Sequence, residues 1–181
     1  MRELSIKNSK RIQKAIVENK ISVAKLLFII NNQIKEKLEK NESFLLVDYS
    51  QSVKELTKIL NFKLLDDFNP DNFPSSIEMT GKKERIIVKK FYYLEKMTSK
   101  KIRLDMMAKG FRPATFTETL FFLIGHRRLR IKIIALGSIY FRPSDNFFIP
   151  LLKIIGNLKE IKYAWLDELI PEDCFVLGVK I

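Results

Sequence analysis

The chain of 181 residues contains a single histidine, His126, and a single cysteine, Cys174, so an imidazole base or a thiol nucleophile must be one of these two. Nucleophilic catalysis requires a nucleophile with a base within hydrogen-bonding reach. His126 is followed by arginines, whose positive charge lowers the basicity of an imidazole. Cys174 follows two acidic residues, whose negative charge disfavours a thiolate. We therefore expect no catalytic residue, an exposed histidine in a turn and a buried structural cysteine.

The residue sets that hold most metals and redox centres are absent from the sequence. One histidine and one cysteine exclude zinc fingers, CxxC redox centres and metal sites with two histidines. The acidic pair Asp66-Asp67 has no matching carboxylate pair or histidine after it, which is typical of a solvated loop. The expectation is a protein that is not an enzyme and has no metal and no cofactor.

Positive charge is the most marked feature of the composition, with 33 Lys and Arg against 21 Asp and Glu, a net charge of +12. Residues 82–112 carry eleven basic and three acidic residues, whereas residues 42–81 carry three and seven. A basic patch beside the aromatic residues 91–93 can bind phosphates and stack bases. Strand side chains alternate between two faces, so only about half of the basic residues can act together. This alternative function, nucleic-acid binding, assigns contacts to Lys89, Lys90, Lys100, Lys101, Arg127, Arg128, Arg130 and Lys132.

The first 81 residues are predicted to form a mainly helical N-terminal module. Apolar residues recur at helical spacing through residues 4–16 and again through residues 23–38, where Ser22 is an N-cap. This pattern predicts a helical hairpin with a wide apolar stripe. A turn-rich stretch with two prolines at residues 69–76 is the predicted boundary of the module.

Residues 82–181 are predicted to form an α+β domain with an antiparallel sheet and two helices. Thr98 or Ser99 caps the first helix and Gly110 ends it, while Thr115 and Glu118 form a capping box for the second, which ends near residue 125. Runs of β-branched and aromatic residues predict strands at 86–94, 131–141, 147–155, 161–165 and 174–180.

Several segments resemble, in order and spacing, an uncharacterised family of short bacterial proteins common in candidate-phylum bacteria. The resemblance spans about residues 45–181. The segments are Asn72-Phe73-Pro74, residues 88–94, the helix ending at Gly110, Phe111-Arg112-Pro113-Ala114-Thr115, residues 133–138, Trp165-Leu166-Asp167 and residues 176–180.

The same order of segments looks like the C-type-lectin-like fold, which formylglycine-generating-type domains also use. That resemblance implies that the opening strand, residues 86–94, pairs with the closing strand, residues 174–180. It also implies that Arg112 to Thr115 start the second helix. The chain lacks the paired cysteines of formylglycine-generating enzymes and the Glu-Pro-Asn and Trp-Asn-Asp calcium motifs of lectins. Neither oxidase chemistry nor calcium-dependent sugar binding is therefore implied.

The leading hypothesis is a non-catalytic recognition module that contacts a protein or other macromolecule. In the fold that the resemblance implies, a rigid framework holds the loops of residues 142–173 for binding. Trp165 is the only tryptophan, and tryptophan often dominates the energy of an interface, although core packing also explains it. The residues assigned to the partner are Asn146, Lys159, Lys162, Tyr163 and Trp165.

The sequence predicts neither a secretory signal nor a membrane span. Charges recur every few residues at the N-terminus, where a signal would have an apolar region. Every apolar run is far shorter than the ~20 residues of a spanning helix. With an unpaired cysteine as well, the expected location is the cytoplasm, without membrane contact. The sequence leaves the oligomeric state open.

Overall fold

A mixed sheet of nine strands organises the described residues of the computed structural model, which are 42–65, 67–73, 81–126, 131–142 and 146–181. The strands are β1 (Glu42–Asp48), β2 (Lys63–Leu64), β3 (Lys83–Tyr92), β4 (Phe111–Pro113), β5 (Ile131–Ile134), β6 (Tyr140–Arg142), β7 (Asn146–Ile155), β8 (Leu158–Trp165) and β9 (Cys174–Lys180). Their order is β1-β3-β9-β5-β7-β8-β2, with β4 beside β9 and β6 beside β7. The predicted antiparallel sheet is corrected in one respect, because β5 runs parallel to β9 and β2 runs parallel to β8.

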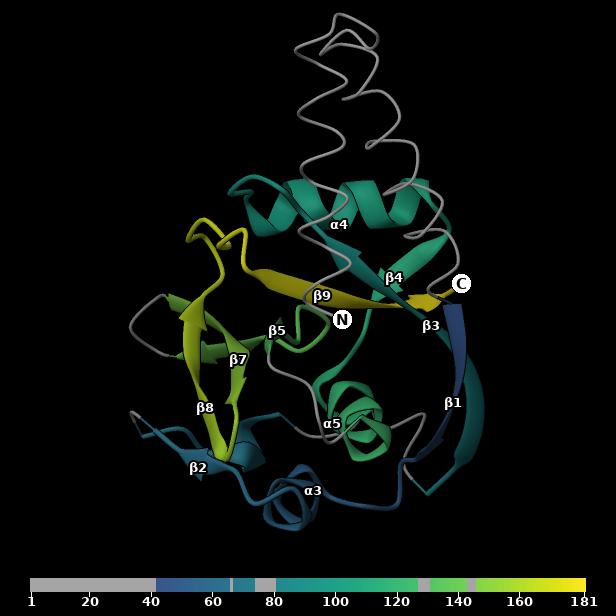
Figure 1. Cartoon of the computed structure of the whole chain (residues 1–181), viewed down its shortest axis with the longest axis vertical. Helices are drawn as coiled ribbons and strands as arrows, with labels where there is room; N and C mark the ends of the chain where they lie inside the picture. Colours follow the sequence, from purple (N-terminus) through teal and green to yellow (C-terminus); the bar gives the residue numbers. More distant parts are fainter. Residues whose placement is uncertain (1–41, 66, 74–80, 127–130, 143–145) are drawn as a thin grey trace, which may run out of the picture. The chain divides into compact units, whose positions relative to one another are not determined.

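Helices pack on both faces of this sheet (Figure 1). The described helices are α3 (Val53–Ile59), the 3-10 turn η1 (Pro70–Asn72), α4 (Ser99–Ala108) and α5 (Phe116–Gly125). Helices α3 and α5 bury their apolar side chains in one core, and α4 buries Ile102 and Met106 in a second core on the opposite face. The domain therefore has three layers, with the sheet in the middle.

The predicted starts and ends of the two helices after residue 82 are confirmed. The Thr98 hydroxyl accepts a hydrogen bond from the Lys101 amide at the start of α4. Thr115 and Glu118 form both hydrogen bonds of a capping box at the start of α5. Gly110 follows α4 with a φ of +77°, a left-handed conformation that glycine adopts without steric cost.

Strand β9 lies in the middle of the core, and residues 174–179 are all buried. It pairs antiparallel with β3, with Val88 opposite Val179, which confirms the predicted pairing of these two strands. Phe175 and Leu177 face α5, while Val176 faces α4, because strand side chains alternate. A strand that is buried on both faces explains the continuous apolar run at the C-terminus.

Residues 42–73 belong to the compact unit Glu42–Ile181, whereas the sequence placed them in the N-terminal module. Strand β1 extends the sheet by pairing with β3 from Glu42 opposite Lys89 to Asp48 opposite Lys83. Leu56 of α3 and Phe73 are buried in the core beside α5. Residues 42–73 thus supply both edge strands of the sheet, β1 and β2, and part of the core on one face. The predicted helical hairpin lies in residues 1–41, outside the described residues.

Two further segments differ from their predictions. The predicted strand at 131–141 is interrupted, because the Gly137 amide donates to the Ala114 carbonyl at 2.9 Å and the Ser138 hydroxyl accepts from the Phe116 amide at 2.8 Å. The connection thus leaves the sheet to hold the start of α5. The predicted strands at 147–155 and 161–165 are confirmed as β7 and β8, but they form one long hairpin that turns through Gly156 and Asn157, so the segment 142–173 assigned as binding loops is mostly strand.

Candidate functional site

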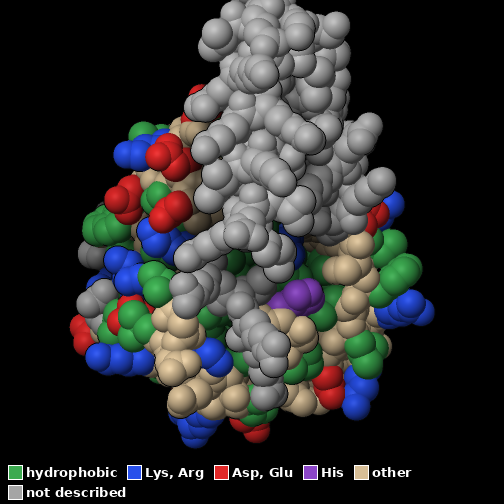
Figure 2. All heavy atoms as spheres, in the orientation of Figure 1, with side chains coloured by type: hydrophobic (Ala, Val, Ile, Leu, Met, Phe, Trp, Pro, Cys, Tyr) green, Lys and Arg blue, Asp and Glu red, His purple; other side chains and the backbone are tan. Residues whose placement is uncertain are grey.

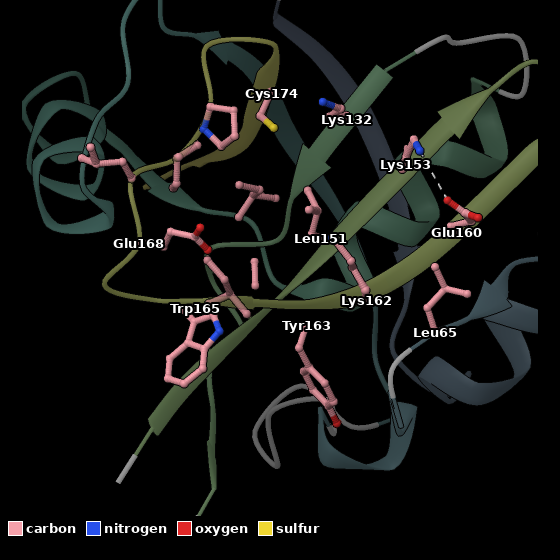
Figure 3. Close-up of a pocket in the computed structure, with 16 residues that line it drawn as sticks. Leu65, Lys132, Leu151, Lys153, Glu160, Lys162, Tyr163, Trp165, Glu168 and Cys174 are labelled. Carbon is pink, nitrogen blue, oxygen red and sulfur yellow. Dashed lines mark ion pairs between the residues drawn. The ribbon is translucent and has the colours of Figure 1, made fainter. Parts of the chain in front are cut away.

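The sheet face that α4 covers is left open by the described helices over β5, β7 and β8. This open part of the face holds a pocket of about 450 Å³ (Figure 3). Its walls are these three strands and the connection from β8 to β9, residues 166–173. We call it the open-face pocket. The lining residues that matter below are Lys132, Leu151, Lys153, Lys162, Glu168 and Cys174.

The floor of the open-face pocket is apolar. Ile134 and Ile149 are fully buried beneath it, and Leu151 and Ala164 are half-buried. Leu169 closes one side from the β8–β9 connection and is 51% exposed. An apolar floor with a few polar groups around it is the usual composition of a ligand or peptide pocket.

Charged side chains of adjacent strands form the rim of the pocket. Lys132 on β5 lies opposite Lys153 on β7, which in turn lies opposite Glu160 on β8. Lys132 forms an ion pair with Asp173, and this hydrogen bond raises the pKa of the lysine ammonium group. Lys153 Nζ lies 3.6 Å from Glu160 Oε2 (Figure 3). Lys162 lies two residues after Glu160 on the same face of β8 and has no ion pair with any described residue.

The structure does not bring the five residues predicted for partner binding to one surface: four lie on β8, on both of its faces, and Asn146 lies on β7. Lys162 lies at the open-face pocket and is exposed. Tyr163 and Trp165 border the same pocket (Figure 3), but their rings pack against Phe148 on the other face of the strand. The Tyr163 hydroxyl accepts a hydrogen bond from Asn72 at 2.8 Å and so holds η1 against the sheet. Trp165 remains 50% exposed.

Lys159 and Asn146 lie away from the pocket floor. Lys159 Nζ donates to the Leu60 carbonyl at 2.9 Å, at the C-terminal end of α3. Asn146 begins β7 opposite Arg142 of β6. Of the five predicted residues, the structure therefore brings only Lys162 and Trp165 to an exposed surface beside the pocket.

Three half-exposed aromatic rings mark the end of the sheet where Trp165 lies. Phe141 and Phe147 are 49% and 44% exposed, and their ring centroids are 5.1 Å apart. Trp165 lies opposite Phe148, the residue after Phe147, so the three rings belong to one end of strands β6, β7 and β8. Sequence reasoning named only the tryptophan.

The basic residues of the nucleic-acid alternative do not share one surface. Lys89 lies over the ring of Phe111 beneath the α4 face, whereas Lys90 lies over Phe122 of α5 on the opposite face. Lys100 and Lys101 are exposed on α4. Lys132 belongs to the open-face pocket, while Arg127, Arg128 and Arg130 lie outside the described residues. On the face drawn in Figure 2, basic side chains are scattered among acidic and apolar ones.

A buried ion pair joins α5 to the rest of the core. Arg112 donates to both carboxylate oxygens of Glu118 at 2.7 and 3.0 Å, and the Tyr49 hydroxyl donates to the same carboxylate at 2.7 Å. The Thr115 amide adds a fourth bond at 2.6 Å. Burial alone would raise the pKa of Glu118, but the hydrogen bonds and charge of Arg112 hold it below its usual range. Every acceptor position is used, so this cluster is structural.

His126 and Cys174 each have a structural setting. His126 stacks on the ring of Phe122 with centroids 4.1 Å apart, and its Nδ1 lies 2.8 Å from the Phe122 carbonyl at the end of α5. Cys174 is 2% exposed, which confirms the predicted buried cysteine. Burial, followed by the charge of Asp173, raises the pKa of its thiol to about 11.

The fold and the pocket together define a mixed α/β domain with a pocket on one sheet face. No protein-family model, curated protein or solved structure matches this chain. The resemblance to the C-type-lectin-like fold therefore stays a prediction. Within the described ranges, no group of three or more His, Cys, Asp and Glu residues could hold a metal ion. No helix in the described part of the chain is long and apolar enough to span a membrane.

The sequence did not predict a site at most of the residues that line the open-face pocket. Leu151, Lys153, Glu160 and Glu168 carried no motif of their own. The signal that could have found them is Gly156-Asn157 between two apolar runs, which is a two-residue hairpin pattern. That hairpin fixes the register and places Lys153 opposite Glu160.

Proposed function

We propose that residues 42–181 form a non-catalytic binding module that holds a protein partner at the open-face pocket. The observation that carries the proposal is the composition of that pocket, in which the apolar floor at Leu151 and Ala164 is surrounded by charged side chains. Interfaces between proteins combine an apolar centre with a polar rim in the same way. Strands rather than loops form the floor, so the surface is held rigidly before binding.

The aromatic end of β6, β7 and β8 extends this surface. Phe141 and Phe147 are about half exposed and lie opposite each other on the sheet face of Ile149 and Leu151. Trp165, also half exposed, borders the pocket with its ring against Phe148 on the other face. Aromatic side chains give much of the binding energy of protein interfaces. Of the five partner-binding residues predicted from the sequence, Lys162 and Trp165 therefore remain as contacts with the partner.

Photo-crosslinking tests the proposal in cells. A benzophenone amino acid in place of Leu169, 51% exposed at the pocket, should form a discrete adduct with a protein. The matched control is the same amino acid in place of Ile59, which is 54% exposed on α3 away from the pocket. The Ile59 variant should not form that adduct.

A second substitution makes the test specific for the pocket floor. Leu151→Glu introduces a charge into the half-buried floor and should remove the adduct formed from position 169. Circular dichroism and a cooperative melt must first show that this variant is folded. An adduct that persists in Leu151→Glu, or that forms equally from position 59, would contradict the proposal. An adduct with RNA instead would favour the nucleic-acid alternative.

A further inference from the structure

The open-face pocket contains a like-charge pair that the fold itself does not require. Lys132 and Lys153 lie directly opposite each other on neighbouring antiparallel strands, so their side chains share one face. Like charges at directly opposite positions destabilise a sheet. Departures from local stability rules are concentrated at functional sites, where the unfavourable contact serves a ligand.

The acids around the pocket compensate only part of this charge. Asp173 pairs with Lys132 and Glu160 pairs with Lys153, which leaves Lys162 without an ion pair among the described residues. Lys162 lies opposite Leu151, next to the Lys153–Glu160 pair along the hairpin. Lys162 is thus the lysine of this group that is left to pair with a ligand, and it lies on β8 immediately beside the apolar floor.

The pocket size and the position of Glu168 limit the anion that can bind there. A volume of about 450 Å³ holds a few side chains and not a stretch of nucleic acid. Glu168 lines the side of the pocket formed by the β8–β9 connection, away from the lysines (Figure 3). A carboxylate at that position repels a polyanion but leaves room for one acidic group directed at the lysines.

We propose that Lys162, supported by Lys132 and Lys153, recognises an aspartate or glutamate side chain in an acidic and apolar segment of the protein partner. The apolar neighbours of that side chain occupy the floor at Leu151 and Ala164. This inference rests on the proposed function and specifies the chemistry of the partner. It assigns the lysines to specificity and the floor to affinity.

Fluorescence anisotropy with defined peptides tests the inference on the full chain. The probe is a short fluorescein-labelled peptide of alternating leucine and glutamate. Three comparison probes replace its glutamates by glutamine, replace its leucines by serine, or are a single-stranded RNA of similar length. The first probe should bind most tightly, because it alone supplies both the anion and the apolar side chains.

Matched lysine variants locate the contact. Lys162→Gln should weaken binding of the leucine–glutamate peptide by about tenfold, the value of one hydrogen bond to a charged group. Lys100→Gln removes the same charge from exposed α4 and should change affinity by less than about twofold. Both variants should melt cooperatively near the wild-type temperature.

The remaining outcomes separate the two proposals. Equal binding of the leucine–glutamine peptide, or no effect of Lys162→Gln, overturns the role of the lysines but leaves a protein-binding pocket that Leu151→Glu still blocks. Equal binding of the serine–glutamate peptide shows non-specific charge attraction and overturns the inference as well. Tighter binding of RNA, weakened by Lys100→Gln, favours the nucleic-acid alternative. Failure of every probe to bind overturns the inference, and the crosslink from position 169 then decides on the proposed function by itself.

Discussion

Two groups of charged side chains in this domain differ in how completely the protein satisfies them. Glu118 of α5 is 1% exposed and accepts four hydrogen bonds, two of them from the half-buried Arg112. Lys132, Lys153 and Lys162 lie at the open-face pocket, where only the first two form ion pairs with described acids. The first group stabilises the fold and has no capacity for a ligand. The second includes Lys162, which has no ion pair with a described residue and lies beside an apolar surface, and this supports the proposed binding role.

Strand β9 connects the two groups, so its removal should have the largest effect. Cys174 borders the open-face pocket, and the Leu177 carbonyl accepts from the Ala114 amide at 2.7 Å beside the Arg112 cluster. Deleting residues 175–181 removes a strand that is buried on both faces between β3 and β5. We expect the truncated protein to lose its cooperative thermal transition by circular dichroism. A transition near the full-length midpoint would show that the C-terminus is peripheral.

The buried ion pair can be broken by one substitution. Glu118→Gln removes the charge that holds Arg112 and should destabilise the domain by about 2–3 kcal/mol in urea denaturation. This is less than for a fully buried pair, because the Arg112 side chain is 42% exposed and stays partly hydrated. The matched control is Glu55→Gln in the exposed capping box of α3, which should destabilise the domain clearly less. Equal costs at both positions would assign the effect to capping alone.

The pH dependence of the same variant identifies the carboxylate. The pKa of Glu118 is held below its usual range in the folded protein, so its ionised form adds stability above the pH at which a free glutamate titrates. That stability is lost as the pH falls through the folded pKa. The difference in unfolding free energy between wild type and Glu118→Gln should therefore be largest at neutral pH and shrink in acid. A difference that does not change with pH would show that the charge is not what stabilises the cluster.

The connection that holds the start of α5 offers a smaller test. A Cβ atom at Gly137 would lie 2.5 Å from the Ala114 carbonyl oxygen, a backbone atom that cannot move without shifting α5. Gly137→Ala should destabilise the domain by about 1–3 kcal/mol. Gly125→Ala is the control, because nothing lies within 4 Å of its Cβ position, and it should leave stability almost unchanged. Thermal melts of the two variants give the comparison directly.

The sequence predicted the parts of the fold that depend on local chemistry. Thr115 with Glu118 and Gly110 after α4 were recognised because capping and left-handed glycine depend on neighbouring residues alone. The break after Ile134 was missed, because the apolar residues 135–136 are as buried in the connection as they would be in a strand. The apolar pattern of a sequence indicates which residues are buried, but it does not show which strand or helix buries them.

The candidate site was harder to predict because its residues meet only through strand register. From the sequence, Lys132 was assigned to nucleic-acid binding and Lys162 to partner binding. Nothing in either segment indicates that the two lysines line the same pocket. Alternation along β8 also separates Lys162 from Tyr163, although the two are adjacent in sequence. Register depends on long-range pairing, which a single sequence specifies weakly.

The effect of Lys162→Gln on stability is expected to be the smallest, and its sign distinguishes the pocket lysines from the Arg112–Glu118 pair. Lys162→Gln removes a positive charge from the pocket without removing an ion pair to a described residue, so repulsion from its lysine neighbours falls. Unfolding free energy should rise by up to ~0.5 kcal/mol at low salt, and the gain should vanish at high salt because exposed charges are screened. Urea denaturation at two salt concentrations measures this change. Replacing a residue that stabilises the fold lowers the unfolding free energy, as we expect for Glu118→Gln. A lysine whose replacement stabilises the domain while peptide binding falls is retained for its ligand, and a loss of stability in Lys162→Gln would instead place it with the structural charges.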